Sequence, residues 1–120
     1  MSETKEQIDV SQWFVEQWPE HASSLRPSMN GLSRRGRAGA ILWNTMKALG
    51  ATVGDPDLAI LVPKGGYGCF LAEHKAADQP RKLTTEQQES IDYNNGIGNC
   101  AVSTRGIDAL KAAITVYMEG

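Results

Sequence analysis

Two short apolar runs separated by a glycine-rich turn predict a β-hairpin, and this hairpin limits the possible folds more than any other feature of the sequence. The first run, Asp57–Val62, is apolar on both faces after its leading carboxylate, which is typical of a strand buried between two layers. The second run, Cys69–Lys75, is apolar until its last three residues. The loop between them, Pro63–Gly68, lacks the spacing of a P-loop or a dinucleotide-binding motif. We therefore expect a small sheet covered by helices on both faces.

Two segments before the hairpin have the pattern of helices. Residues 4–18 carry one apolar stripe, and Pro19 ends the helix. A second helix follows the arginine-rich segment 31–39 and ends at Gly50. The apolar stripes of these two helices are Val10, Trp13, Phe14 and Trp18, and Ile41, Leu42, Met46 and Leu49. The two tryptophans are expected either in the core or on a surface that a partner subunit covers.

Two further helices are predicted after the hairpin. Thr84 or Thr85 is expected to cap the first, because Gln87 or Gln88 lies three residues further on and completes a capping box. This helix ends at 94–96, where Asn-Asn-Gly occurs. The second is expected to start after Thr104 as its cap. Its apolar stripe is Ile107, Leu110, Ile114 and Tyr117.

A third strand is predicted at Ile97–Ser103, and the irregular segment 22–29 leaves room for a short edge strand. The predicted order is helix, basic loop, helix, strand, strand, helix, strand, helix. This order indicates an α/β fold, a three-layer sandwich with a small central mixed β-sheet flanked by helices. At 120 residues the chain is expected to fold as a single domain, residues 1–120.

The composition is that of an ordinary globular protein. No apolar run in the sequence is long enough to span a membrane. The polar start differs from a secretory signal, so we expect a cytoplasmic protein that is not bound to a membrane. Cys69 and Cys100 lie in apolar runs and are expected to be buried, reduced thiols. A zinc site formed by these cysteines with His21 and His74 would lack the usual close ligand spacing.

The charge is unevenly distributed along the chain. Residues 34–82 contain eight Lys or Arg and four Asp or Glu, while each flank sums to −3. Cations in this region would suit an anionic polymer such as DNA, although an uneven solvated surface explains the same pattern. The candidate DNA-binding residues are Arg34, Arg35, Arg37, Lys47, Arg81 and Lys82.

The predicted hairpin brings Asp57, Glu73 and Lys75 to one end of the sheet. Glu73 and Lys75 are two residues apart, and this spacing places them on the same face of a strand. Two carboxylates from different strands suit a hard divalent cation such as Mg²⁺ or Mn²⁺, and a neighbouring lysine would lie beside a metal-bound water. An exposed network of charged pairs is the alternative interpretation. The side chain of His74 is expected on the opposite face.

This set of motifs resembles the PD-(D/E)xK nuclease superfamily and, within it, the VRR-NUC family of virus-type replication-repair nucleases. The residues that carry the resemblance are Asp55-Pro-Asp-Leu58, Leu71-Ala-Glu-His-Lys75, Leu83-Thr-Thr-Glu-Gln87, Asn30-Gly31, Lys47-Ala-Leu-Gly50 and Val116-Tyr117. The histidine at position 74 departs from the family, which usually has an apolar residue there.

The resemblance implies a restriction-endonuclease-like fold and a DNA endonuclease that depends on Mg²⁺ or Mn²⁺. Asp57 and Glu73 would be metal ligands together with the backbone carbonyl of His74. Lys75 would serve the nucleophilic water, and Gln87 would support the site. The family often adds a glutamate from its first helix, for which Glu6 is the candidate and Glu16 its rival.

Stand-alone members of this family are typically phage or bacterial homodimers that act on branched DNA such as Holliday junctions. The resemblance therefore implies a homodimer, a branched DNA substrate and a link to DNA repair for this chain. Two alternatives stay open. The chain could be a nucleic-acid-binding module with this fold that does not cleave, or a nuclease specific for flaps or single strands.

Overall fold

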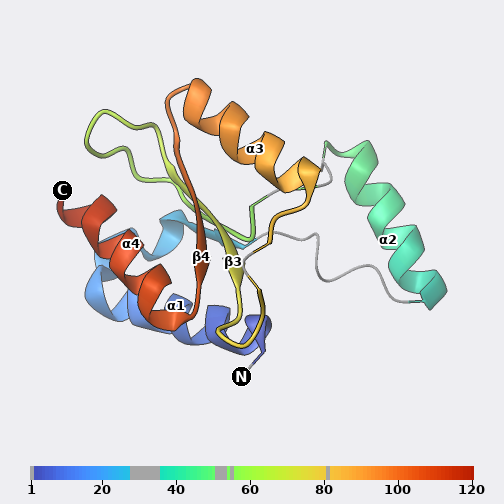
Figure 1. Cartoon of the computed structure of the whole chain (residues 1–120), viewed down its shortest axis with the longest axis horizontal. Helices are drawn as coiled ribbons and strands as arrows, with labels where there is room; N and C mark the ends of the chain where they lie inside the picture. Colours follow the sequence, from blue (N-terminus) through green and yellow to red (C-terminus); the bar gives the residue numbers. More distant parts are fainter. Residues whose placement is uncertain (1, 28–35, 51–53, 55, 81) are drawn as a thin grey trace.

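The computed structural model describes residues 2–27, 36–50, 54, 56–80 and 82–120, and its elements confirm an α/β fold (Figure 1). The predicted sites Arg34, Arg35 and Arg81 lie outside these residues. The helices are α1 (Glu3–Gln17), the 3₁₀-helix η1 (Pro19–Ser24), α2 (Gly36–Ala48), α3 (Thr85–Gly96) and α4 (Ile107–Glu119). The strands are β1 (Leu25–Pro27), β2 (Leu58–Ile60), β3 (Phe70–Lys75) and β4 (Cys100–Arg105).

The four strands form one mixed sheet in the order β1-β2-β3-β4. The pairs β1–β2 and β2–β3 are antiparallel, whereas β3 and β4 are parallel. Helix α3 makes the crossover between the two parallel strands, as such a pair requires. In their register Glu73 lies beside Ser103 and Lys75 beside Arg105, so each pair shares one face of the sheet.

Helices cover both faces of the sheet, which confirms the predicted three-layer arrangement. On one face, α1 and α4 bury their apolar stripes against β2 and β3 (Figure 1). The opposite face is covered by α3. The buried core residues are Val10, Phe14, Leu58, Ile60, Val62, Phe70, Ala72, Leu110, Ile114, Tyr117 and Met118. At about 25 cal/mol per Å² of buried apolar surface, this core is the main stabilising contribution to the fold.

The tryptophans of α1 belong to the margin of this core. Trp13 and Trp18 are partly buried against it and pack edge to face, with their ring centroids 5.5 Å apart. The attraction between the edge of one ring and the face of the other helps to hold the end of α1 where the chain continues into η1. The indole rings are therefore engaged within the chain.

Helix α2 confirms the predicted second helix, but its apolar stripe is largely exposed. Ile41, Leu42 and Leu49 are 58%, 43% and 78% exposed, and α2 stands beside the sheet rather than over it (Figure 1). Gly50 follows the helix with a φ of +111°, in agreement with the predicted helix end.

The cap predicted at Thr104 is wrong. Parallel pairing with β3 continues through Arg105, so Thr104 is still part of a strand, and Gly106 caps α4. The predicted capping box of α3 is confirmed for Thr84 and Gln87. No described helix combines the length and the apolarity that a bilayer crossing requires.

Candidate active site

The end of β3 brings the predicted carboxylates together on the face of the sheet that α3 covers. The side chain of Glu73 is buried, and its Oε1 accepts a hydrogen bond of 2.7 Å from Nε2 of Gln87. The neighbouring Asp57 lies in the bend before β2, close enough to Glu73 for their carboxyl groups to share a hydrogen bond. A carboxyl group from β3 and one from the bend before β2 therefore meet beneath the start of α3.

Asp57 is held by the main chain of β3. The antiparallel pairing of β2 with β3 stops at the pair Leu58 and Ala72, so the N–H of His74 lacks a partner from β2. Oδ2 of Asp57 accepts this N–H at 2.8 Å and replaces the missing ladder bond. The bond fixes the Asp57 carboxylate relative to the peptide group between Glu73 and His74.

Gly54 lets the turn before Asp57 approach the start of α3. Its φ is +88°, and a Cβ at this position would lie 2.7 Å from the backbone carbonyl of Glu86 and 3.0 Å from the nitrogen of Gln87. Only glycine fits both the backbone conformation and the close approach. The turn that carries Asp57 is thus packed directly against the turn that carries Gln87.

The amide of Gln87 acts on both the helix cap and the site. Its Oε1 accepts the backbone N–H of Thr84 at 2.9 Å, while its own backbone N–H donates to Oγ1 of Thr84. Because a backbone N–H can only donate, the Oε1 atom must face Thr84, and the amide nitrogen must face Glu73. The capping box therefore orients Gln87 as a hydrogen-bond donor to Glu73.

Lys75 is the cation that the described structure places at the two carboxyl groups. Its Nζ lies 3.8 Å from Oε1 of Glu73, and its side chain is 19% exposed. The ammonium group thus lies beside the buried Glu73 carboxyl group and is itself partly accessible to solvent. The spacing predicted from the Glu-x-Lys sequence is present in the folded chain.

The electrostatics of Glu73 are dominated by its burial. Burial and the adjacent Asp57 carboxylate, helped by the hydrogen bond between them, raise the pKa of Glu73 to about 8. Lys75 lowers this pKa and the carboxylate of Glu3 raises it, both to a lesser extent. A carboxyl pair that retains a proton near neutral pH lacks the positive charge needed to ionise both groups. A bound divalent cation would supply that charge. The oxygen donors present therefore fit Mg²⁺ or Mn²⁺.

The described residues contain no group of three or more His, Cys, Asp or Glu side chains arranged to hold a metal ion. The ligands available are therefore the two carboxylates and a main-chain carbonyl, for which the peptide of His74 is the predicted source. A hard divalent cation commonly completes its shell with water.

The structure places Glu6 away from this pair. It lies on the α1 side of the sheet, where its carboxylate accepts from the side chain of His74 and from the N–H of Ala77. Glu16 is exposed near the opposite end of α1, thirteen residues beyond Glu3 or about 20 Å along the helix axis. The first-helix carboxylate whose charge reaches Glu73 is instead Glu3, in the first turn of α1.

Glu3 was not predicted from the sequence, although it lies three residues before Glu6 on the same predicted helix. Two positions three residues apart lie on neighbouring parts of a helix surface, so both glutamates face the sheet end if one does. The choice depends on which side of β3 each reaches, and that is a matter of tertiary packing.

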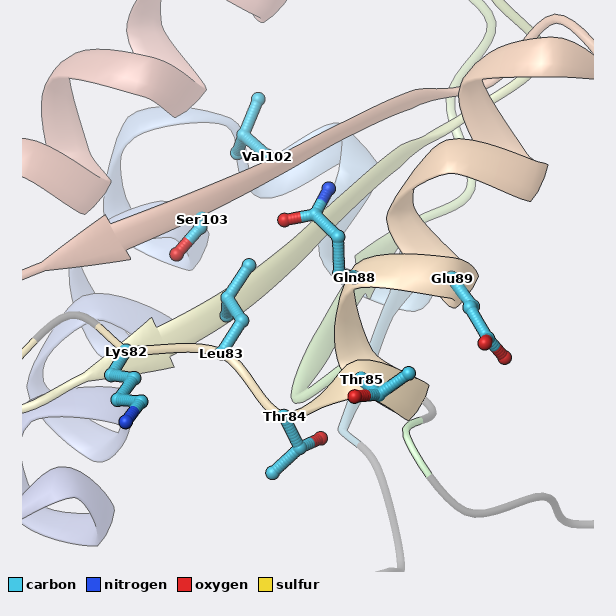
Figure 2. A pocket seen from close by; sticks show the side chains of 8 residues that line it. All are labelled: Lys82, Leu83, Thr84, Thr85, Gln88, Glu89, Val102 and Ser103. Carbon is cyan, nitrogen blue, oxygen red and sulfur yellow. The ribbon is translucent and has the colours of Figure 1, made fainter.

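Of the predicted DNA-binding residues that the structure describes, Arg37 and Lys47 are exposed on α2, and Lys82 is exposed before α3. Lys82 borders a hollow of about 870 Å³ between the start of α3 and β4 (Figure 2). Ser103 also lines this hollow and is the register partner of Glu73. The hollow lies along β4, the edge strand of the sheet and the neighbour of β3, and none of Asp57, Glu73 and Lys75 lines it.

The two cysteines are unpaired thiols that are only partly buried, so the prediction of a reduced state agrees with the structure and that of full burial does not. Burial still raises the pKa of both thiols.

Comparison with models of protein families and with curated proteins gives no match to the sequence. Among solved structures the chain is similar to a "VRR_NUC domain protein", with a TM-score of 0.81 and 24% sequence identity. The similarity covers 99% of this chain and 89% of the other. The likeness confirms the VRR-NUC fold that the sequence motifs indicated.

Proposed function

We propose that the protein is a metal-dependent deoxyribonuclease that hydrolyses phosphodiester bonds within DNA. The observation that carries this proposal is the buried carboxyl group of Glu73, which meets the half-buried carboxyl group of Asp57 and has Lys75 beside it. The similarity to a solved VRR_NUC domain protein supports it, because the motif residues and the fold then point to the same chemistry. Burying the Glu73 carboxyl group next to a second carboxyl group is costly unless a cation compensates the charge.

Asp57, Glu73 and the carbonyl of His74 would hold Mg²⁺ or Mn²⁺. When bound, such an ion lowers the pKa of a coordinated water and stabilises negative charge on a phosphoryl group. Gln87 keeps the Glu73 carboxylate oriented through its hydrogen bond. Lys75 would orient the attacking water and neutralise charge that develops on the phosphate.

DNA is the substrate that the charge distribution favours. Lys82 and Thr85 border the hollow between α3 and β4, and Arg37 and Lys47 are presented on α2. Cations along this side of the molecule would hold a phosphate backbone. We propose branched DNA, such as a Holliday junction, as the preferred form, with flaps and single strands as the alternative substrates.

A homodimer would place two such sites on a symmetric junction. The exposed apolar residues of α2, Ile41, Leu42 and Leu49, offer an apolar surface that a second copy could cover. Trp13 and Trp18 are less suitable, because they already pack within the chain. Light scattering would report twice the chain mass for the dimer and the chain mass for a monomer.

The decisive experiment incubates the protein with labelled four-way junction, flap, single-stranded and linear duplex DNA in Mg²⁺, Mn²⁺ or EDTA. Cleavage is expected with either metal and should be absent in EDTA. If no substrate is cut in either metal while DNA is still bound, the protein is a non-cleaving binding module and the proposal is wrong.

The site assignment is tested with Lys75→Ala, which should abolish cleavage while DNA binding persists. Lys64→Ala is the matched control, because Lys64 lies in the loop at the other end of the hairpin. The control should cleave at the wild-type rate. A fully active Lys75→Ala variant would show that another group performs the role assigned to Lys75.

A further inference from the structure

A buried polar network lies directly behind the carboxyl pair, on the other face of β3. His74 is fully buried, and both of its ring nitrogens are engaged. Nε2 lies 2.8 Å from Oε1 of Glu6 in α1, and Nδ1 lies 2.8 Å from Oγ1 of Thr104 in β4. The imidazole therefore joins three elements of the fold at the point where β3 reaches the site.

The Glu6 carboxylate completes this network. It is 2% exposed, and its Oε2 accepts the N–H of Ala77, at the turn after β3, at 3.0 Å. Burial would raise the pKa of Glu6, but the hydrogen bonds from Ala77 and His74 outweigh it, so the pKa is lowered. The carboxylate is thus ionised and can only accept, so Nε2 of His74 donates to it, while Nδ1 is hydrogen-bonded to the Thr104 hydroxyl.

The main chain of His74 connects this network to the site. Its N–H holds the Asp57 carboxylate at 2.8 Å, and its two neighbours in sequence are Glu73 and Lys75. Any rotation or shift of the residue that loosened the imidazole would move the N–H to which Asp57 is bonded. A side chain fixed at both ends in a close-packed interior leaves little room for such a shift.

We propose that Glu6 and Thr104 are positioning residues, which hold the metal-binding end of β3 by clamping the imidazole of His74. This inference rests on the proposed function, since it concerns the same metal site. It assigns Glu6 a role other than that of a metal ligand. It also explains how a histidine can replace the apolar residue at position 74, because the polar ring is fully satisfied on the core side.

A purely structural role would also make these residues matter, so the test must separate metal affinity from stability. Partners that orient metal ligands typically change metal affinity about tenfold to a hundredfold when they are removed. We therefore expect Glu6→Ala to weaken Mn²⁺ binding by about tenfold or more, measured by titration calorimetry without DNA at a temperature where the variant is folded.

Two further variants make the result specific. Glu6→Gln should retain most of the Mn²⁺ affinity. Its amide oxygen can accept the N–H of Ala77, and its amide nitrogen can donate to Nε2 when the imidazole carries its proton on Nδ1. Val10→Ala is the matched control. Val10 is a fully buried residue of the same helix outside the network, so this variant should lose stability but bind Mn²⁺ like wild type.

Wild-type Mn²⁺ affinity in a folded Glu6→Ala variant would overturn the inference. If Glu6→Ala does not fold, Thr104→Val decides. This variant removes only the hydroxyl that bonds Nδ1, and an unchanged dissociation constant there would equally overturn the inference. A weakened constant would support it.

The proposed function can fail independently of this inference. If wild-type protein binds Mn²⁺ but cleaves no DNA, the nuclease proposal is wrong. The Mn²⁺ affinities of the Glu6 and Thr104 variants still test the positioning role. If wild-type protein cleaves DNA and Glu6→Ala keeps its metal affinity, the positioning role alone is wrong. A wild-type protein that binds no Mn²⁺ refutes both.

Discussion

Replacing Glu73 by glutamine should stabilise the metal-free protein near neutral pH. The wild-type side chain is buried, and its neighbours raise its pKa to about 8, whereas the ordinary value is 4.5. In the unfolded chain the carboxyl group ionises at its ordinary pKa, which favours unfolding as the pH rises. The amide of Glu73→Gln has no proton to lose, and it can keep the hydrogen bond to Gln87 as an acceptor.

The size of this effect follows from the range of pH over which only the unfolded state is ionised. The contribution of the protonated Glu73 to stability is complete below pH 4.5 and is lost as the pH rises toward 8. Two and a half units lie between 4.5 and pH 7, and at about 1.4 kcal/mol per unit they correspond to about 3 kcal/mol. For a chain of this length that difference is about 10 °C in Tm.

The assay is urea unfolding of wild type and Glu73→Gln in EDTA at pH 5, 6, 7 and 8, followed by the fluorescence of the tryptophans. The free-energy difference between the two proteins should grow by about 3 kcal/mol between pH 5 and pH 7. Glu16→Gln makes the same chemical change at an exposed site of α1 and serves as the control.

Saturating Mn²⁺ should reverse the order of stability, because only the wild-type carboxylate binds the ion. A difference between wild type and Glu73→Gln that stays constant from pH 5 to pH 8 would refute the argument. It would mean that the Glu73 carboxyl group is ionised in the folded protein throughout this range.

Two further substitutions test the packing around the site. Gly54→Ala should destabilise the fold by about 1–3 kcal/mol and weaken Mn²⁺ binding, because the added Cβ lies 2.7 Å from the backbone of Glu86 and must displace the turn that carries Asp57. Wild-type stability and affinity in this variant would contradict the tight approach. Tyr117→Phe should cost about 1–2 kcal/mol in urea unfolding, because it leaves the buried carbonyl of Val62 without the hydroxyl that donates to it at 2.6 Å. Its cleavage rate should not change, since Tyr117 packs on the α4 side of the sheet; a lower rate would show that the two faces are coupled.

The parts of the fold that the sequence predicted are those set by local signals. The Thr84–Gln87 capping box, the helix end at Gly50 and the buried stripe of α4 all depend on residues within one or two turns of each other. The strand limits were less accurate, because pairing partners decide where a strand ends. Thr104 shows this directly, since a good helix cap by type became a strand residue through parallel pairing with β3.

Helix α2 could not be placed from its pattern. An apolar stripe on a helix indicates that something covers it, but it does not indicate whether the cover is the same chain or another. In this structure Ile41, Leu42 and Leu49 remain exposed, although the periodicity matches that of a core helix as well as that of α4 does. Periodicity alone therefore cannot distinguish a core face from an interface.

The candidate site divides in the same way. The two-residue spacing of Glu73 and Lys75 fixes their common face, and the position of Gln87 in a capping box fixes which way its amide points, so both were accessible from the sequence. The face of β3 toward which a glutamate of α1 points is fixed by the packing angle of that helix. No local pattern reports this angle, so the sequence alone leaves Glu6 and Glu16 as candidates for the metal site.

The partner of Glu6 was nevertheless present in the sequence as an anomaly. A histidine in an otherwise apolar strand, on the face opposite the site, must satisfy two ring nitrogens in the core or remain costly to bury. The chain supplies an acceptor from α1 and a hydroxyl from β4, and these are the contacts that His74 makes. A buried polar residue that breaks a pattern therefore predicts a partner of complementary chemistry elsewhere in the chain. Here the carboxylate that was expected to bind the metal is that partner.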